Sequence, residues 1–194
     1  MNADRMIRSF LAIGIPGEIL GEIGRLQERL KREIQGDIRW VRPDGIHLTL
    51  KFFGDIPEGA VSDISAVVEK AVAGHDPLDL SVSGAGVFPD LRRPRVLWLG
   101  MTGDVERLLT LQTTLERDLQ RIGFPREERP FRPHLTLARI RSQRDMTGLG
   151  RALEKRGGCE AGRFVAAGLG LLKSDLTPQG AIYTKLREFP FAGR

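Results

Sequence analysis

The tetrapeptide His-Leu-Thr-Leu occurs twice in this chain of 194 residues, and its two copies open with two of the three histidines of the chain. The copies are 87 residues apart, from His47 to His134. Two long amphipathic segments, which begin at Glu18 and Val105, show the same displacement of 87 residues. A constant offset over successive segments indicates an internal duplication. The sequence therefore predicts a fold built from two similar halves, each of which presents one copy.

The sequence predicts the same order of secondary structure in both halves of the chain. Apolar runs that end at glycine or proline indicate buried strands, and apolar side chains three or four residues apart indicate helices. The predicted strands are residues 7–16, 45–54, 78–89, 94–101, 132–140, 160–174 and 181–191. The predicted helices are residues 16–34, 57–74, 104–123 and, with interrupting glycines, 144–158.

We therefore expect an α+β fold with two duplicated α/β lobes. The lobes are expected to carry two sheets that face a central cleft, with one His-x-Thr-x motif from each lobe in that cleft. Residues 1–194 are expected to form a single two-lobed domain. Whether the strands run parallel or antiparallel does not follow from the sequence.

The charge of the chain favours an anionic partner. The formal net charge is +5 and the pI is about 9.9, a bias that suits nucleic acid or phosphate esters. Hydrophobic residues make up 41% and charged residues 28%, as in an ordinary soluble protein. The apolar run at residues 10–13 is too short to span a membrane, and no secretory cleavage pattern is present. We therefore expect a cytoplasmic protein.

The alternation of side chains along a strand divides each motif into two faces. His47 and Thr49 share one face, and the leucines of the motif share the other, where they can anchor the strand in a core. His134 and Thr136 are related in the same way. If an approximate two-fold axis relates the lobes, the two polar faces can meet across the cleft.

Two facing histidines are suited to acid–base catalysis. The pKa of a free imidazole is about 6.5, so one ring can act as base while the other acts as acid near neutral pH. The threonine hydroxyls can donate hydrogen bonds to a phosphate between the rings. A metal site is the alternative, but zinc usually takes a third protein ligand, and the sequence holds no further cluster of histidines or cysteines. The residues therefore favour acid–base catalysis over a metal site.

Four further residues are weaker candidates for substrate binding. Lys51 and Phe53 have the parity of the first motif histidine, so Lys51 could touch phosphate or be solvated, and Phe53 could stack on a nucleobase or pack in the core. Arg139 has the opposite parity to the second motif histidine and reaches the cleft only if its strand ends or bulges. Arg95 lies in an arginine-rich turn that could line a path for RNA.

The chain resembles the two-histidine phosphoesterase superfamily, whose mark is a pair of His-x-Thr-x motifs. Within that superfamily it is similar to the RNA 2′,3′-cyclic phosphodiesterases, historically called 2′-5′ RNA ligases. The resemblance covers nearly the whole chain. It includes the segments "RSFLAIGIP", "GIHLTLKFFGD", "FPDLRRPRVLWLG", "RPHLTLARI" and "LLKSDLTPQGAIYTKLREFPF".

The resemblance implies hydrolysis of a 2′,3′-cyclic phosphate at an RNA 3′ end to a 2′-phosphomonoester. It assigns His47 as the proton donor to the leaving 3′ oxygen and His134 as the proton acceptor that activates water. It assigns Thr49 and Thr136 to phosphate binding, and Arg139 fits the family's pattern. It implies no metal and no other cofactor. We expect a monomer whose partner is RNA.

Three other functions remain open. ATP-independent joining of a 2′,3′-cyclic phosphate end to a 5′-hydroxyl, as a 2′-5′ bond, could be the main activity. The same site could act on a small cyclic nucleotide. The fold could also serve as a non-catalytic RNA-binding module, although both histidine–threonine pairs are intact, which argues against that function.

Overall fold

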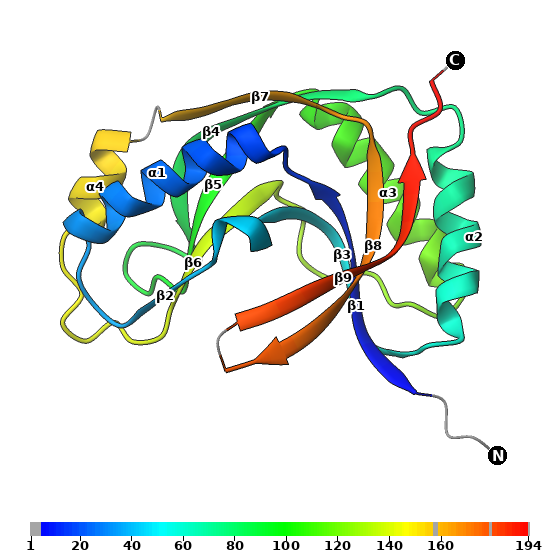
Figure 1. Ribbon diagram of the computed structural model, residues 1–194, viewed down its shortest axis with the longest axis horizontal. Coiled ribbons are helices and arrows are strands. Elements are labelled where there is room, and N and C mark those ends of the chain that lie inside the picture. The colour runs from blue at the N-terminus through cyan, green and yellow to red at the C-terminus, as the bar shows by residue number, and fades with distance from the viewer. Residues whose placement is uncertain (1–4, 157–158, 179, 194) are drawn as a thin grey trace.

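The structure, a computed structural model, describes residues 5–156, 159–178 and 180–193. In these ranges the chain forms a curled antiparallel sheet flanked by helices (Figure 1). The strands are β1 (Met6–Gly14), β2 (Ile38–Trp40), β3 (His47–Pro57), β4 (Leu78–Phe88), β5 (Val96–Gly103), β6 (His134–Ile140), β7 (Glu160–Ala166), β8 (Gly168–Thr177) and β9 (Gly180–Pro190). The helices are α1 (Gly17–Glu33), α2 (Ala60–Val72), α3 (Val105–Arg121) and α4 (Leu149–Arg156), with a short 3-10 helix η1 at Pro43–Gly45.

The two motif strands are neighbours in the sheet. The strand order is β7-β4-β5-β6-β3-β1-β8-β9, and β2 pairs with β6 beside this path. Leu48 of β3 pairs with Leu135 of β6, and this pair joins the two halves of the sheet. The two sheets expected from the sequence are therefore one continuous sheet, because the motif strands lie next to each other. The α+β class with two related lobes is confirmed.

Each half of the sheet contains strands from both halves of the sequence. β4 belongs to the first half of the sequence and pairs with β5, whereas β8 belongs to the second half and pairs with β1. The order β6-β5-β4-β7 therefore has the same pattern as the order β3-β1-β8-β9. The exchange leaves β3 and β6 together at the seam between the halves.

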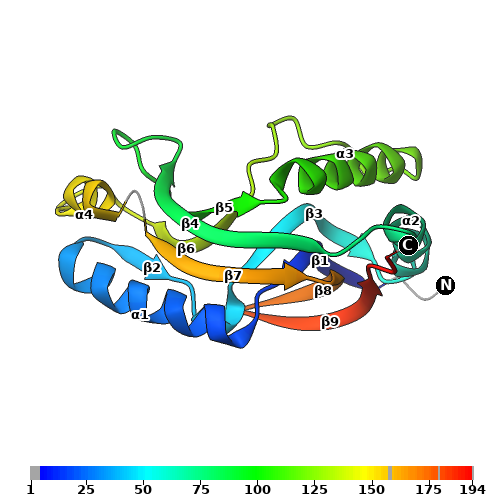
Figure 2. The ribbon, with the colours of Figure 1, turned by 90° about the horizontal axis from the view of Figure 1, so that it is seen from above.

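The helices gather in two pairs at opposite ends of the molecule. Figures 1 and 2 show α1 with α4 at one end and α2 with α3 at the other. α1 carries Glu18 in its first turn and Lys31 and Arg32 in its last turn, which stabilises a helix through its dipole. In the described ranges, no helix combines the length and the apolar character that crossing a bilayer requires.

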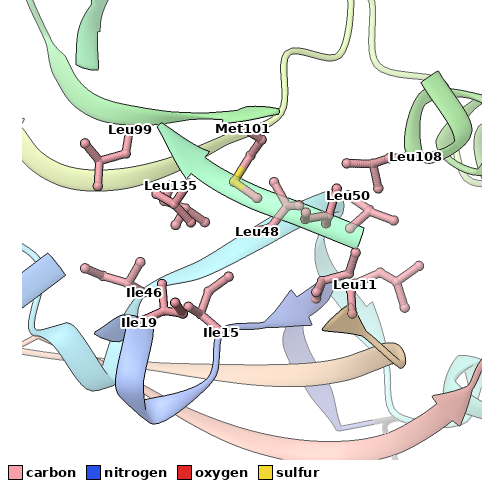
Figure 3. Packing of buried hydrophobic residues seen from close by; sticks show 14 of the residues in the cluster. Leu11, Ile15, Ile19, Ile46, Leu48, Leu50, Leu99, Met101, Leu108 and Leu135 are labelled. Carbon is pink, nitrogen blue, oxygen red and sulfur yellow. The ribbon is translucent and has the colours of Figure 1, made fainter. Parts of the chain in front are cut away.

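The motif leucines lie at the centre of the core. Figure 3 shows Leu48, Leu50 and Leu135 in the same apolar layer as Leu11 of β1 and Leu108 of α3. Full burial of one leucine side chain stabilises a fold by about 1.5–3 kcal/mol. Because the leucines occupy the core face of β3 and β6, the histidines and threonines of the motifs are held on the opposite face.

Three elements differ from those that the sequence predicts. β2 has only three residues, which are too few to show a period. The single strand expected at residues 160–174 is divided into β7 and β8 around Ala167. The weak helix expected at residues 144–158 is α4, which begins at Leu149, and its expected end at residues 157–158 lies outside the described residues.

Candidate active site

The four polar residues of the two motifs lie side by side on one face of the sheet. β3 and β6 are antiparallel and pair at the central leucines of the motifs, so His47 lies beside Thr136 and Thr49 lies beside His134. The histidines occupy one diagonal of this group and the threonines occupy the other. Diagonal neighbours across an antiparallel pair are about 7–8 Å apart, which leaves room for one phosphate group at the centre.

A cavity of about 560 Å³ lies over this face, and all four motif residues line it. Its walls come from β1, β2, β3, β6 and the hairpin of β8 and β9. Arg8, Arg39 and Arg139 also line the cavity. Within the described ranges, no carboxylate forms a salt bridge with these three guanidinium groups. The cavity therefore presents unneutralised positive charge, which favours a phosphate.

Both imidazole rings are oriented by a backbone carbonyl two residues earlier. Nδ1 of His47 lies 2.9 Å from the carbonyl oxygen of Gly45, and Nδ1 of His134 lies 2.6 Å from that of Arg132. A carbonyl oxygen only accepts a hydrogen bond, so Nδ1 carries the proton in both rings. Nε2 is then the nitrogen left for the substrate, and it can accept a proton when neutral or donate one when charged.

His47 is held in an aromatic environment. Its ring stacks on Phe10, with centroids 4.5 Å apart, and meets the edge of Tyr183 at 5.0 Å. Burial lowers the pKa of His47, while the hydrogen bond to the Gly45 carbonyl opposes this change. Burial in this aromatic environment thus disfavours the charged imidazolium of His47 relative to that of a free imidazole. A bound phosphate would act in the other direction, because a nearby negative charge favours the imidazolium.

The threonine hydroxyls are available to a ligand. In the described part of the chain, neither Thr49 nor Thr136 forms a side-chain hydrogen bond. Both hydroxyls can therefore donate to a phosphate oxygen.

A β-bulge in β3 changes which side chains face the cavity. The pairing of β3 with β1 skips Leu50, and both Leu50 and Lys51 are buried. Phe52, which is 46% exposed, lines the cavity instead. Phe53 packs edge-to-face against Phe124, with centroids 5.2 Å apart. Of the two places expected for Phe53, the structure shows packing in the core and not a position in the cleft, because the bulge reverses the alternation.

A matching bulge in β6 brings Arg139 to the cavity. The pairing of β6 with β5 skips Leu137, and Arg139 then lines the cavity on the side of the motif residues. Phe52 and Arg139 are 87 residues apart, so they occupy equivalent positions in the two halves. The sequence predicted that Arg139 reaches the cleft only if its strand ends or bulges, and β6 has such a bulge.

At each bulge, a backbone carbonyl accepts a hydrogen bond from a buried glutamine that belongs to the other half of the sequence. Gln27 of α1 donates to the carbonyl oxygens of Leu137, at 3.0 Å, and Val41, at 2.8 Å. Gln112 of α3 donates to the carbonyl oxygen of Leu50 at 3.4 Å. Each helix therefore holds the motif strand of the other half.

Lys51 lies in a buried ion pair and not in the cavity with the histidines. Its Nζ donates to Oε2 of Glu116 and to the carbonyl oxygen of Pro125, both at 2.8 Å. The two charged side chains are 5% and 9% exposed. Lys51 thus ties β3 to α3 and to the segment before the second motif, which corrects the expectation of a phosphate contact or a solvated side chain. Arg95 lines a neighbouring cavity.

Several residues around the cavity were missed by sequence reasoning. Phe52 had a signal, since it stands 87 residues before Arg139. Tyr183 and Arg39 had none, because they reach the cavity through β9 and the three-residue strand β2. Over the residues that the structure describes, no three His, Cys, Asp or Glu side chains are grouped as metal ligands.

Paired histidines and threonines on the floor of a basic cavity define a site for a phosphate ester. The family model described as LigT-like phosphoesterase matches residues 13–98 and again residues 99–183. The chain therefore belongs to the LigT-like phosphoesterase family, and its two halves are the two repeats of that family. The resemblance inferred from the sequence is confirmed.

The relatives agree over most of their length. The RNA 2′,3′-cyclic phosphodiesterase of Methanothermobacter thermautotrophicus is 36% identical over 94% of this chain and 98% of its own. The RNA 2′,3′-cyclic phosphodiesterase of Aquifex aeolicus is 34% identical over 88% of this chain and 92% of its own. Among solved structures, TT0787 of Thermus thermophilus has a TM-score of 0.79 at 26% identity, covering 96% of this chain and 99% of its own. Escherichia coli LigT complexed with 3′-AMP has a TM-score of 0.78 at 27% identity, covering 97% and 99%.

Proposed function

We propose that the chain hydrolyses the 2′,3′-cyclic phosphate at an RNA 3′ end to a 2′-phosphomonoester, without a metal. The observation that carries this proposal is the crossed arrangement of two histidines and two threonines under a basic cavity. Hydrolysis requires one proton to reach the leaving oxygen and another to leave the attacking water. The names of the relatives from Methanothermobacter and Aquifex and the 3′-AMP bound to Escherichia coli LigT support this substrate class.

The acid and base roles are taken from the family, and the tautomer leaves Nε2 of each ring as the nitrogen that acts on the substrate. His47 donates the Nε2 proton to the leaving 3′ oxygen, and His134 accepts the proton of the attacking water at Nε2. Thr49 and Thr136 donate to the non-bridging oxygens, where negative charge grows in the transition state. Burial makes protonated His47 a stronger acid, and the phosphate favours its protonation on binding.

One chain supplies both histidines, so the proposed unit of function is a monomer in which residues 1–194 act as one two-lobed domain. Its proposed partner is RNA, and its proposed location is the cytoplasm. Joining to a 5′-hydroxyl would use the same groups and is ranked second, because water far outnumbers RNA ends.

The test is turnover of a short RNA that ends in a 2′,3′-cyclic phosphate, in the presence of EDTA, with identification of the product phosphate. We expect hydrolysis to the 2′-phosphomonoester. A 3′-phosphomonoester would show that the leaving oxygen is the 2′ oxygen. A need for added metal would contradict the metal-free mechanism, and turnover of cyclic mononucleotides alone would assign the site to a small molecule.

A further inference from the structure

Residues 122–133, here called the strap, join α3 to β6. Nδ1 of His134 donates to the carbonyl oxygen of Arg132, a strap residue, at 2.6 Å. This hydrogen bond decides which ring nitrogen carries the proton. Because Nδ1 is protonated, Nε2 is free to accept the proton of the attacking water. The position of the strap therefore sets the tautomer in which His134 can act as a base.

The strap has little support from backbone contacts. At its start, the backbone N–H of Phe124 donates to the carbonyl oxygen of Leu119 in α3 at 3.1 Å. Over residues 128–133, the backbone forms no hydrogen bond with another backbone group in the described part of the chain. Residues 129–132 line the neighbouring cavity, so the strap faces open space on that side. Contacts with side chains are therefore needed to hold the strap in place.

A buried carboxylate anchors the strap from below. Oε2 of Glu116, in α3, accepts a hydrogen bond from the backbone N–H of Glu127 at 3.2 Å and another from Nζ of Lys51 at 2.8 Å. Nζ of Lys51 also donates to the carbonyl oxygen of Pro125 at 2.8 Å. Two buried side chains, one from α3 and one from β3, therefore bind the strap at two of its residues.

The same carboxylate is connected to the bulge of β3. Oε1 of Glu116 accepts a hydrogen bond from Nε2 of Gln112 at 3.3 Å, and this nitrogen also donates to the carbonyl oxygen of Leu50 at 3.4 Å. Leu50 is the residue that the pairing of β3 with β1 skips. A buried polar network whose members are all satisfied rigidifies the groups that it joins. This network thus fixes both the bulge that turns Phe52 to the cavity and the strap that holds His134.

The first half of the chain has an equivalent arrangement. Gln27 of α1 donates to the carbonyl oxygen of Val41, in the segment before β3, and to that of Leu137 in β6. The segment before β3 contains Gly45, whose carbonyl oxygen lies 2.9 Å from Nδ1 of His47. In each half, a buried side chain on the long helix therefore binds the segment that orients the histidine of that half. The recurrence of this arrangement links the buried side chains to the histidines.

We propose that Glu116 is a positioning residue for His134, an inference that rests on the proposed function of the site. Through the N–H of Glu127, its carboxylate holds the strap where the Arg132 carbonyl binds Nδ1–H of His134. Without this anchor the strap can move, and the ring can take the tautomer in which Nε2 carries the proton. A histidine base in the wrong tautomer loses most of its effect on the rate.

Two double variants test the anchor without leaving a buried charge unpaired. Lys51→Met with Glu116→Gln keeps an oxygen that accepts the N–H of Glu127, whereas Lys51→Met with Glu116→Leu removes it. We expect the first to hydrolyse a 2′,3′-cyclic mononucleotide with a kcat within about threefold of the wild type, and the second to lose about ten- to hundredfold in kcat with little change in KM. Glu128→Leu, which changes an exposed strap residue outside the linings of both cavities, should behave as the wild type does.

The tautomer itself is measured by ¹⁵N–¹H NMR of the imidazole rings, at a pH at which the rings are neutral. In the wild type and in the variant with Glu116→Gln, we expect the proton of His134 on Nδ1. In the variant with Glu116→Leu, we expect a mixture of both tautomers for His134 and no change for His47. His47 is the internal control, because the carbonyl of Gly45, and not the strap, orients its ring. A general loosening of the fold would change both rings.

A second variant tests the strap without changing the buried side chains. Insertion of one glycine between Glu128 and Arg129 lengthens the path from the anchor to His134 at an exposed position. We expect the same loss of kcat and the same mixture of His134 tautomers, with the free energy of unfolding nearly unchanged. If the variant with Glu116→Leu does not fold, the insertion decides alone.

A wild-type kcat and a single Nδ1–H tautomer of His134, in either folded variant, would overturn the inference. Absence of hydrolysis by the wild type would instead contradict the proposed function of the site, while NMR would still report whether Glu116 sets the tautomer of His134. The two failures are therefore distinguishable.

Discussion

Phe52 and Phe53 are adjacent in sequence but have different environments. Phe52 lines both cavities and lies under the guanidinium of Arg8, whose Cζ is 4.5 Å from the ring centroid. Phe53 packs against Phe124. The alternation of a regular strand assigns these places the other way round, and the bulge at Leu50 is the physical reason for the difference.

The two phenylalanines should respond differently to truncation. Phe52→Ala should raise the KM for a cyclic phosphate on RNA about tenfold, since base stacking contributes about 1–3 kcal/mol, and should leave the free energy of unfolding nearly unchanged. Phe53→Ala should lower the free energy of unfolding by about 3 kcal/mol with little effect on KM in the folded protein. Steady-state kinetics and urea unfolding separate the two effects. The reverse pattern would place Phe53 in the cavity after all.

Desolvation of His47 predicts a pH effect. If His47 is the acid, kcat/KM falls as the pH rises through its pKa, which burial places below 6.5. Tyr183→Ala should admit water to the ring and raise this pKa, so the alkaline limb of the profile should move to higher pH. Movement of the acidic limb instead would identify His47 as the base. The control is Thr184→Ala, a change at an exposed neighbouring side chain outside the linings of both cavities, which should leave both limbs in place.

At the scale of elements, the ion pair of Lys51 and Glu116 joins a motif strand to a helix from the other half of the sequence. Lys51→Met leaves the buried Glu116 carboxylate without its counter-charge and should lower the free energy of unfolding by about 3–5 kcal/mol. Lys51→Met combined with Glu116→Gln should recover most of that loss, because no charge is then buried. Urea denaturation of the wild type, of Lys51→Met, of Glu116→Gln and of the double variant measures the coupling energy between the two side chains. A cost below about 1 kcal/mol for Lys51→Met would contradict the role of the pair.

The sequence predicted the helices and strands in which apolar side chains recur with a clear period. It did not predict the local backbone geometry that depends on contacts with distant parts of the chain. The long helices and the motif strands agree with α1, α3, β3 and β6. The bulges were not predicted, since they depend on carbonyls that Gln27 and Gln112 bind from distant helices. The sequence also did not predict that β4 pairs with β5 or that β8 pairs with β1. In the sequence, β4 and β8 are apolar runs that carry no signal for a particular partner strand.

At the scale of the whole molecule, the duplication explains why the site lies at the seam. Each repeat supplies one histidine and one threonine, and the antiparallel pairing of β3 with β6 crosses them. The repeated tetrapeptide was enough to predict this shared site. It was not enough to predict one continuous sheet, because a motif specifies which residues share a face and not which strands are neighbours.

His47 and His134 are proposed to act on the same phosphate. The most direct test of this is kcat for hydrolysis of a cyclic-phosphate RNA by His47→Ala, His134→Ala and the double variant. Each single change should lower kcat by about 10²–10⁴, and the double variant should be little slower than the worse single variant, because the two groups work as a unit. Circular dichroism should show all three variants folded. A folded single variant that keeps the wild-type kcat would contradict the account.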